Sequence, residues 1–213
     1  MDFIPAAGPL AAFTLAAIVL AITPGPDMTL FVGRTLAQGK RAGVAAFAGA
    51  CTGSMVHTTL AALGLSALLA ASPTAFTVLK LAGALYLAWL AVQAIRHGSS
   101  FNLDAALDRD RSIGANVLTG IGINLLNPKI ILFFVTFLPT FISASDPHAA
   151  GKLFFLGFYF ILVSAPICIG IIFVASRVAT TLKRQPRVMR TIDYVFASVF
   201  SGFAVSILLT PSR

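Results

Sequence analysis

The sequence predicts an all-α integral membrane protein with six transmembrane helices, arranged as two inverted three-helix repeats with proline-broken first and fourth helices. Its composition, the length of its apolar runs and the matched positions of two proline breaks predict this fold. The chain has 213 residues, of which 58% are hydrophobic and 10% are charged, and its mean hydropathy is +0.93. Because a soluble domain carries about 25% charged residues, this chain has too few polar groups to form a water-exposed surface.

Six apolar runs are long enough to cross a bilayer as helices, which takes about 20 residues. They lie at residues 10–33, 43–70, 74–95, 113–141, 152–176 and 191–210. These runs lack the two-residue alternation that is typical of transmembrane barrel strands. No basic region precedes the first run, so we expect it to be a transmembrane helix rather than a cleavable signal peptide.

The two halves of the chain are organised alike. The most polar stretch, residues 96–112, is predicted to be a cytoplasmic linker between a first repeat at 1–95 and a second at 113–213. Each half begins with a run that proline interrupts, at residues 23–27 (TPGPD) and at residues 127–129 (NPK). Three spans per half would place the second half upside down, as in many secondary transporters. Because prolines are common in membrane helices, two unrelated kinks are the alternative.

The basic residues predict the orientation of the helices in the membrane. Eleven of the fifteen lie in the loops after the first, third and fifth runs, which are therefore expected to be cytoplasmic. They are Arg34, Lys40, Arg41, Arg96, Arg109, Arg111, Arg177, Lys183, Arg184, Arg187 and Arg190. Both termini would then lie outside. The net charge of +8 is explained by this topology and by contact with anionic lipid heads, so no nucleic-acid partner is predicted.

Two charged residues follow the proline breaks directly. Irregular backbone persists at membrane depth only where it faces protein or a water-filled cavity. Asp27 follows the first break and Lys129 the second, and ionisable residues within spans usually mark substrate or proton pathways. A structural ion pair between the two helices is the alternative, and the two roles can coexist.

Further polar side chains extend this candidate site. Asn124 and Asn127 belong to a polar stripe on the fourth run that leads to Pro128. His57 lies in the second run and Tyr86 in the third, where each either lines the cavity or packs against a neighbouring helix. The sequence does not decide between these two roles.

Two other functional classes are weighed against a transporter. An intramembrane enzyme needs a catalytic constellation, and Asp27 is the one carboxylate well inside a predicted span, so no catalytic residue is predicted. A cation or metal exporter of a related superfamily is the nearer rival. The two cysteines and three histidines are scattered, which predicts no metal ligands and no cofactor.

Three stretches resemble the LysE/RhtB family of amino-acid exporters. Residues 22–57 (ITPGPDMTLFVGRTLAQGKRAGVAAFAGACTGSMVH) are similar to its first two helices. Residues 79–96 (LKLAGALYLAWLAVQAIR) resemble its third helix, and residues 120–141 (GIGINLLNPKIILFFVTFLPTF) its fourth. By position, the family motif comprises Pro24, Gly25, Pro26, Asp27, Asn127, Pro128 and Lys129.

The resemblance implies a multi-pass exporter in the bacterial inner membrane that moves amino acids or close derivatives outward, driven by the proton gradient. Its partners would be the substrate, protons and the lipid bilayer, and a homo-oligomer is left open. We expect Lys129 to bind the substrate carboxylate, and Asp27 to carry the proton or to meet the substrate ammonium. The sequence does not indicate which amino acid is exported.

Overall fold

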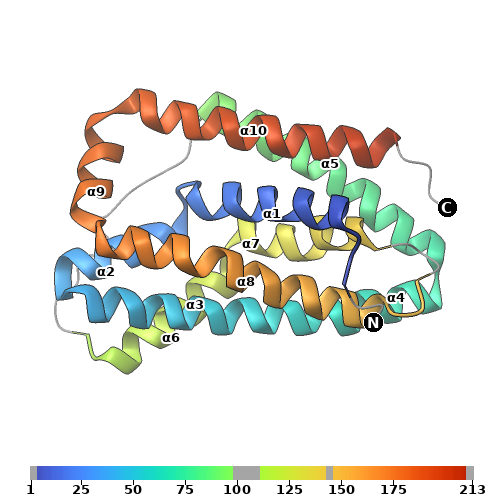
Figure 1. The fold of residues 1–213 in the computed structure, drawn as a ribbon, viewed down its shortest axis with the longest axis horizontal. Helices are drawn as coiled ribbons and strands as arrows, with labels where there is room; N and C mark the ends of the chain where they lie inside the picture. Colours follow the sequence, from blue (N-terminus) through green and yellow to red (C-terminus); the bar gives the residue numbers. More distant parts are fainter. Residues whose placement is uncertain (1–3, 98–110, 143–145, 210–213) are drawn as a thin grey trace.

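The computed structural model describes residues 4–97, 111–142 and 146–209. All regular structure in this described part is helical (Figure 1), which confirms the predicted helical class. The first half contains α1 (Ala7–Ile22), α2 (Pro26–Gln38), α3 (Lys40–Leu60), the π-helical η1 (Ala61–Leu65), α4 (Ser66–Ala71) and α5 (Pro73–His97). The second contains α6 (Ile113–Leu126), α7 (Pro128–Leu132), the π-helical η3 (Phe133–Phe137), the 3-10 helix η4 (Leu138–Phe141), α8 (Ala149–Phe173), α9 (Ala175–Arg184) and α10 (Pro186–Leu209).

Several of these helices are long and apolar enough to cross a bilayer. Within the described residues, these are Thr77–Arg96, Ala149–Phe173 and Pro186–Ile207. Two bent pairs, α1 with α2 and α6 through η4, raise the number to as many as five if each pair is one span. The second predicted run, 43–70, falls on α3, η1 and α4, which do not pass the same test. The number of six spans therefore stays a prediction.

The outside of the bundle is apolar, as a bilayer requires. Leu126 is 80% exposed and Leu118 70% exposed, although both are large hydrophobic side chains. Such side chains recur on α3, α5, α8 and α10. In water this surface would be unfavourable by about 25 cal/mol per Å², so lipid is the solvent that suits it.

The two bends occur where proline removes a backbone donor. α1 ends at Ile22, Thr23 is extended, and α2 begins with Pro26 as its first helical residue. The axes of α1 and α2 differ by 49°. In the second half, α6 ends at Leu126 and α7 begins with Pro128, with a bend of 54°. Proline is tolerated at a first helical position because that N–H has no helical partner.

The predicted boundaries need correction at three places. The helices of the first run extend over residues 7–38 rather than 10–33. The fifth run, 152–176, corresponds to α8, but the loop expected after it contains a separate short helix, α9, and α10 begins at Pro186 rather than at 191. Of the predicted linker 96–112, residues 98–110 lie outside the described part of the chain.

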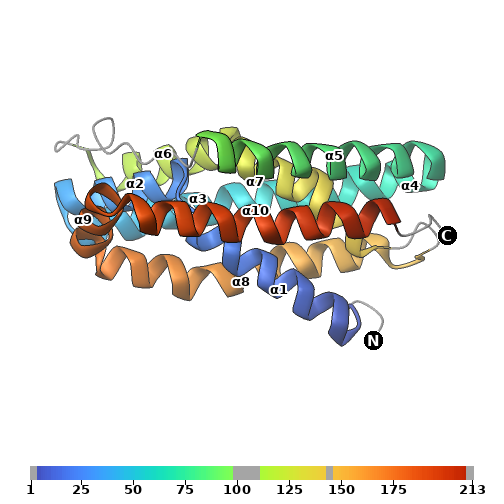
Figure 2. The same cartoon turned by 90° about the horizontal axis from the view of Figure 1, so that it is seen from above.

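The helices pack side by side along the long axis of the molecule. α5 and α10 form one pair, and α3 packs against both α6 and α8 (Figures 1 and 2). Phenylalanine rings fill the core, and Phe13, Phe133, Phe137 and Phe200 are 0–1% exposed. These rings lie on α1, η3 and α10, so the core joins both halves of the chain.

Glycines bring α3 and α6 into close contact. A Cβ on Gly49 would overlap the Val117 carbonyl, and a Cβ on Gly120 would overlap the Ala46 carbonyl. At Gly53 a Cβ would lie 2.6 Å from Asn124 Oδ1. Small residues that let helix backbones approach are typical of membrane bundles. Here they hold the end of α6, with Asn124, directly against α3.

Candidate functional site

The two helix breaks present the same local arrangement. Gly25 is the N-cap of α2, followed by Pro26 and then Asp27. Asn127 is the N-cap of α7, followed by Pro128 and Lys129. Asp27 and Lys129 therefore occupy the second helical position after each break, and each points its charge into the interior of the bundle.

Lys129 binds the backbone of the first break. Its Nζ donates hydrogen bonds to the Leu20 carbonyl at 3.1 Å and to the Thr23 carbonyl at 2.8 Å. The helical donor for the Leu20 carbonyl would be the amide of residue 24, which is proline and has no N–H. The ammonium thus satisfies a carbonyl that the break leaves without a helical partner.

Gly25 leaves space for this ammonium. A Cβ at Gly25 would lie 3.2 Å from Lys129 Nζ and 3.5 Å from its Cε. The backbone φ of Gly25 is −179°, an extended conformation that any residue adopts. Glycine is therefore needed here for close approach rather than for conformational freedom.

Asp27 is bound by amides of the second break. Its Oδ2 accepts hydrogen bonds from Asn124 Nδ2 at 3.1 Å and from Asn127 Nδ2 at 3.0 Å. Asn127 Oδ1 also accepts a bond from the Lys129 amide, which caps α7. Asn124 Oδ1 accepts a bond from the Ser54 hydroxyl of α3. Each half of the chain thus supplies the partners for the charge of the other half.

The other carboxylate oxygen of Asp27 has no such partner. Oδ1 is buried and makes no hydrogen bond within the described part of the chain. A buried carboxylate oxygen without a donor is costly. It is therefore the atom of this site best placed to receive a proton or an ammonium group.

Both charges line one cavity of about 50 Å³. Since a water molecule needs roughly 10–15 Å³ of such space, the cavity has room for a few waters. Polar groups from α3, α6 and α8, among them Ser54, Asn124 and Ser164, share the wall with aromatic rings. The rings are those of Phe31, Phe47 and Phe160, and the thiols of Cys51 and Cys168 complete this side.

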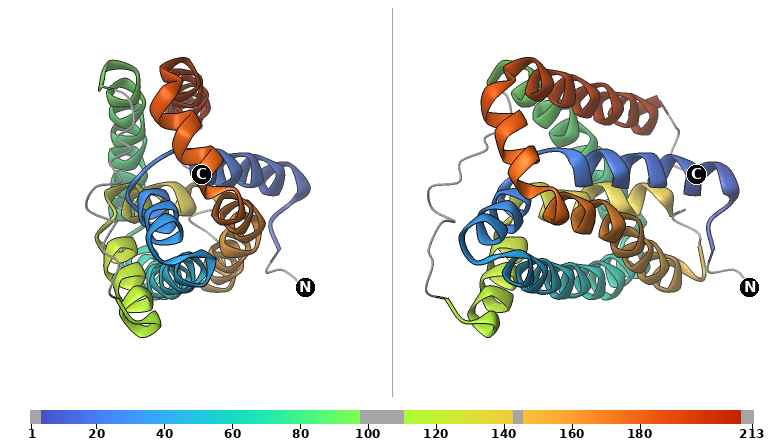
Figure 3. Two further views of the ribbon diagram at one scale, coloured as in Figure 1. Left: turned by 90° about the vertical axis from the view of Figure 1, so that its left-hand side faces the viewer. Right: turned by 60° about the vertical axis from the view of Figure 1, so that its left-hand side comes forward.

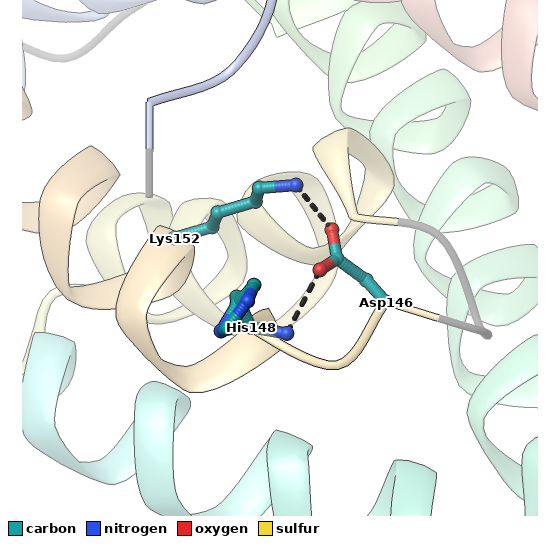
Figure 4. A network of polar contacts seen from close by, with 3 residues as sticks. All are labelled: Asp146, His148 and Lys152. Carbon is teal, nitrogen blue, oxygen red and sulfur yellow. Dashed lines mark hydrogen bonds and ion pairs between the residues drawn. The ribbon is translucent and has the colours of Figure 1, made fainter. Parts of the chain in front are cut away.

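Asp27 and Lys129, both in the described part of the chain, form no direct ion pair. A direct ion pair does join Lys152 to Asp146, at the start of α8 (Figure 4). In the cavity, Lys129 instead binds backbone carbonyls and Asp27 binds side-chain amides. This geometry differs from the simple pair considered as the structural alternative.

Two of the predicted site residues, His57 and Tyr86, lie outside the lining of this cavity. His57 Nε2 lies 3.3 Å from the Asn124 carbonyl, and its ring stacks on Phe134 at 5.6 Å. His57 thus contacts the end of α6 and is not among the residues that line the cavity. Tyr86 contacts Trp89 on α5, away from the cavity lining.

Several cavity residues were not among the predicted site residues. Ser54, Ser164 and the three phenylalanines line the cavity from α2, α3 and α8. Ser164 was detectable in principle, as a hydroxyl in an otherwise apolar stretch two residues before Pro166. The phenylalanines gave no signal, because apolar residues on a membrane helix face lipid, core or cavity with the same sequence pattern. Within the described residues, no group of three His, Cys, Asp or Glu side chains is placed to bind a metal ion.

An apolar helical bundle with two bent helices around a buried, charged cavity is the architecture of a membrane transporter. The LysE type translocator family model matches residues 18–210, and the chain belongs to this family. The family predicted from the sequence is thereby confirmed, and with it the class of transporter rather than enzyme.

Named relatives cover nearly the whole chain. A homoserine/homoserine lactone efflux protein of Salmonella typhimurium is 34% identical, over 95% of this chain and 96% of that protein. A leucine efflux protein of Klebsiella pneumoniae is 31% identical, over 90% and 91%. An uncharacterized membrane protein of Vibrio cholerae is 31% identical, over 90% and 92%. No solved structure matches the chain significantly. The relatives and the apolar helices together place the chain in a membrane as a multi-pass protein.

Proposed function

We propose that this protein exports neutral amino acids or close derivatives across the bacterial inner membrane, in exchange for protons. The observation that carries the proposal is the buried oxygen Oδ1 of Asp27, which has no hydrogen-bond partner among the described residues, beside a cavity that Asp27 and Lys129 both line. An amino acid at this place would offer its ammonium to Asp27 Oδ1 and its carboxylate to Lys129. Asp27 and Lys129 would then bind the ammonium and carboxylate groups that all amino acids share.

The remaining cavity lining suggests the class of substrate side chain. Among the lining residues, Asp27 and Lys129 are the charged ones, and the rest are apolar, aromatic, hydroxyl, thiol or amide groups. A third charge on a lysine or glutamate side chain would be desolvated without a partner, which is strongly unfavourable. Neutral side chains fit this lining, in keeping with the relatives named for homoserine and leucine efflux.

Proton antiport follows from competition for one carboxylate. Protonated Asp27 cannot bind the substrate ammonium as an ion, so proton entry and substrate release are coupled at Oδ1. A proton that moves down 100 mV provides about 2.3 kcal/mol. This is enough to sustain a gradient of a neutral zwitterion of roughly fifty-fold.

An inverted repeat is the architecture that we propose for alternating access. The equivalent positions of Asp27 and Lys129, and the similar bends of 49° and 54°, support it. The pairing of α3 with α8 and of α5 with α10 supports it too, because each pair joins corresponding helices of the two halves. In this arrangement residues 1–95 and 113–213 are the repeats, six spans cross the membrane, and both termini lie outside.

The experiment that tests the proposal measures transport in proteoliposomes with an imposed pH gradient. Wild-type protein should transport homoserine or leucine and exclude lysine and glutamate. Asp27→Asn should abolish proton-driven transport and leave the protein folded and inserted. Asp146→Asn, a matched carboxylate change outside the cavity, should transport as wild type does. Normal antiport by Asp27→Asn, or preferred transport of lysine, would contradict the proposal.

A further inference from the structure

α9 is a short helix with two unlike faces at one end of the bundle. It connects α8 to α10 and lies beside α2 (Figures 1 and 3). On one face Ala175 and Ala179 are buried in a cluster with Met28 and Val32 of α2. Because α9 joins the end of one apolar membrane helix to the start of another, it lies at the boundary between bilayer and water.

The opposite face of α9 is basic. Arg177 and Arg184 are exposed and lie seven residues apart, so they project from the same side of the helix. Arg187 is also exposed and follows Arg184 by three residues, at the start of α10. Residues 175–187 contain no aspartate or glutamate. The basic face, defined as Arg177, Arg184 and Arg187, therefore has no carboxylate within its own segment.

We propose that this basic face binds the headgroups of anionic phospholipids and thereby holds α9 against α2. Clusters of arginine next to membrane helices are attracted to anionic lipid surfaces. The apolar face of α9 is already covered by Met28 and Val32, so α9 meets the lipid through its charges rather than by inserting into the acyl layer. Charge complementarity at the headgroup level thus selects anionic lipid as the occupant.

This contact reaches the transport cavity through one buried cluster. Met28, which α9 covers, lies next to Asp27 and is itself part of the cavity wall. Headgroup binding on the outer face therefore stabilises the packing at one edge of the cavity. The inference concerns lipid binding alone and does not depend on which substrate is carried.

A lipid titration of the purified full chain tests the inference. The thermal unfolding midpoint is measured in a neutral detergent at low salt, with added phosphatidylglycerol or phosphatidylcholine. Phosphatidylglycerol should raise the midpoint, and phosphatidylcholine should not. The variant R177Q/R184Q should need a concentration of phosphatidylglycerol about 30-fold higher for half of the effect, and R177K/R184K should restore it.

The matched control removes two exposed charges elsewhere. R41Q/R96Q changes the net charge equally and should shift the half-effect concentration much less than R177Q/R184Q does, because neither arginine lies on α9. An equal loss in both double variants would overturn the inference, since a general charge effect would then explain it. A wild-type response to soluble glycerol phosphate as large as that to phosphatidylglycerol would also overturn it, because lipid would then not be the ligand.

Discussion

Lys152 and Asp146 form a direct ion pair at the start of α8 (Figure 4), whereas Lys129 and Asp27 line one cavity and form no direct ion pair. In this outer pair, Lys152 donates a hydrogen bond directly to Asp146. Asp146 also accepts a hydrogen bond from the His148 amide, which fixes the turn before α8. Asp27 and Lys129, the inner charges, bind other groups instead. Asp27 accepts from amides of the second half of the chain, and Lys129 donates to carbonyls of the first half.

The difference shows how a charge can be stable in the bundle and still be available. In a direct ion pair each charge is compensated by the other, so neither group attracts a charged ligand strongly. Asp27 instead receives two neutral amide donors on one oxygen and has no hydrogen-bond partner on the second among the described residues, while Lys129 is held by neutral carbonyls. Neutral partners reduce the cost of burial without cancelling the charge, which suits the role in binding and release that we propose for Asp27.

Removing the inner cation should have the largest effect. Lys129→Ala leaves the Leu20 and Thr23 carbonyls without their donor and Asp27 without a compensating charge. We expect a loss of stability of about 3–5 kcal/mol, as for other buried charges that lose their counterpart, together with loss of transport. Thermal unfolding in detergent and transport in proteoliposomes measure the two effects.

A double variant separates structure from transport at the same site. Asp27→Asn with Lys129→Gln removes both charges, so stability should recover relative to Lys129→Ala. Proton-driven transport should stay absent, because no group remains that exchanges a proton. If the double variant retained proton-coupled export, Asp27 would merely hold the helices together.

Reducing the space around the Lys129 ammonium should have an effect on stability and transport of intermediate size. Gly25→Ala places a Cβ 3.2 Å from Lys129 Nζ, so the ammonium must shift by a few tenths of an ångström. We expect a cost of about 1 kcal/mol and weaker substrate binding. Gly122→Ala is the matched control, because a Cβ there meets nothing within 4 Å. Similar transport kinetics in both variants would show that the position of the ammonium does not matter.

The outer pair should contribute least, and its contribution should depend on pH. Burial raises the pKa of Asp146, but the hydrogen bonds from Lys152 and the His148 amide outweigh it and hold the pKa below its usual 3.8. A lowered pKa in the folded state adds stability above the unfolded value and loses it as pH falls through the folded value. Asp146→Asn should therefore cost less than about 1 kcal/mol at neutral pH and a smaller amount at a pH well below 3.8, where the carboxylate becomes protonated in the folded state as well. Unfolding midpoints at both pH values check this, and equal losses at both would contradict it.

Local chemistry made much of this protein predictable. Proline removes an N–H wherever it occurs, so the breaks near Pro24 and Pro128 follow from sequence alone, as does the helical class from the composition. The motif around the two breaks also identified the family. Asp27, Lys129, Asn124 and Asn127 were all predicted site residues, because a polar group in an apolar run is conspicuous without a structure.

The pairing of these residues required the tertiary structure. Asp27 and Asn127 are 100 positions apart, and Lys129 is 109 positions from Leu20 and 106 from Thr23. No local rule fixes such contacts. The tertiary packing also places Tyr86 away from the cavity lining and brings His57 against the Asn124 carbonyl. The structure also contains the short helix α9 where the sequence predicted the loop after the fifth run. Helix propensity and hydropathy describe one segment at a time, whereas a binding cavity depends on which faces of distant segments meet.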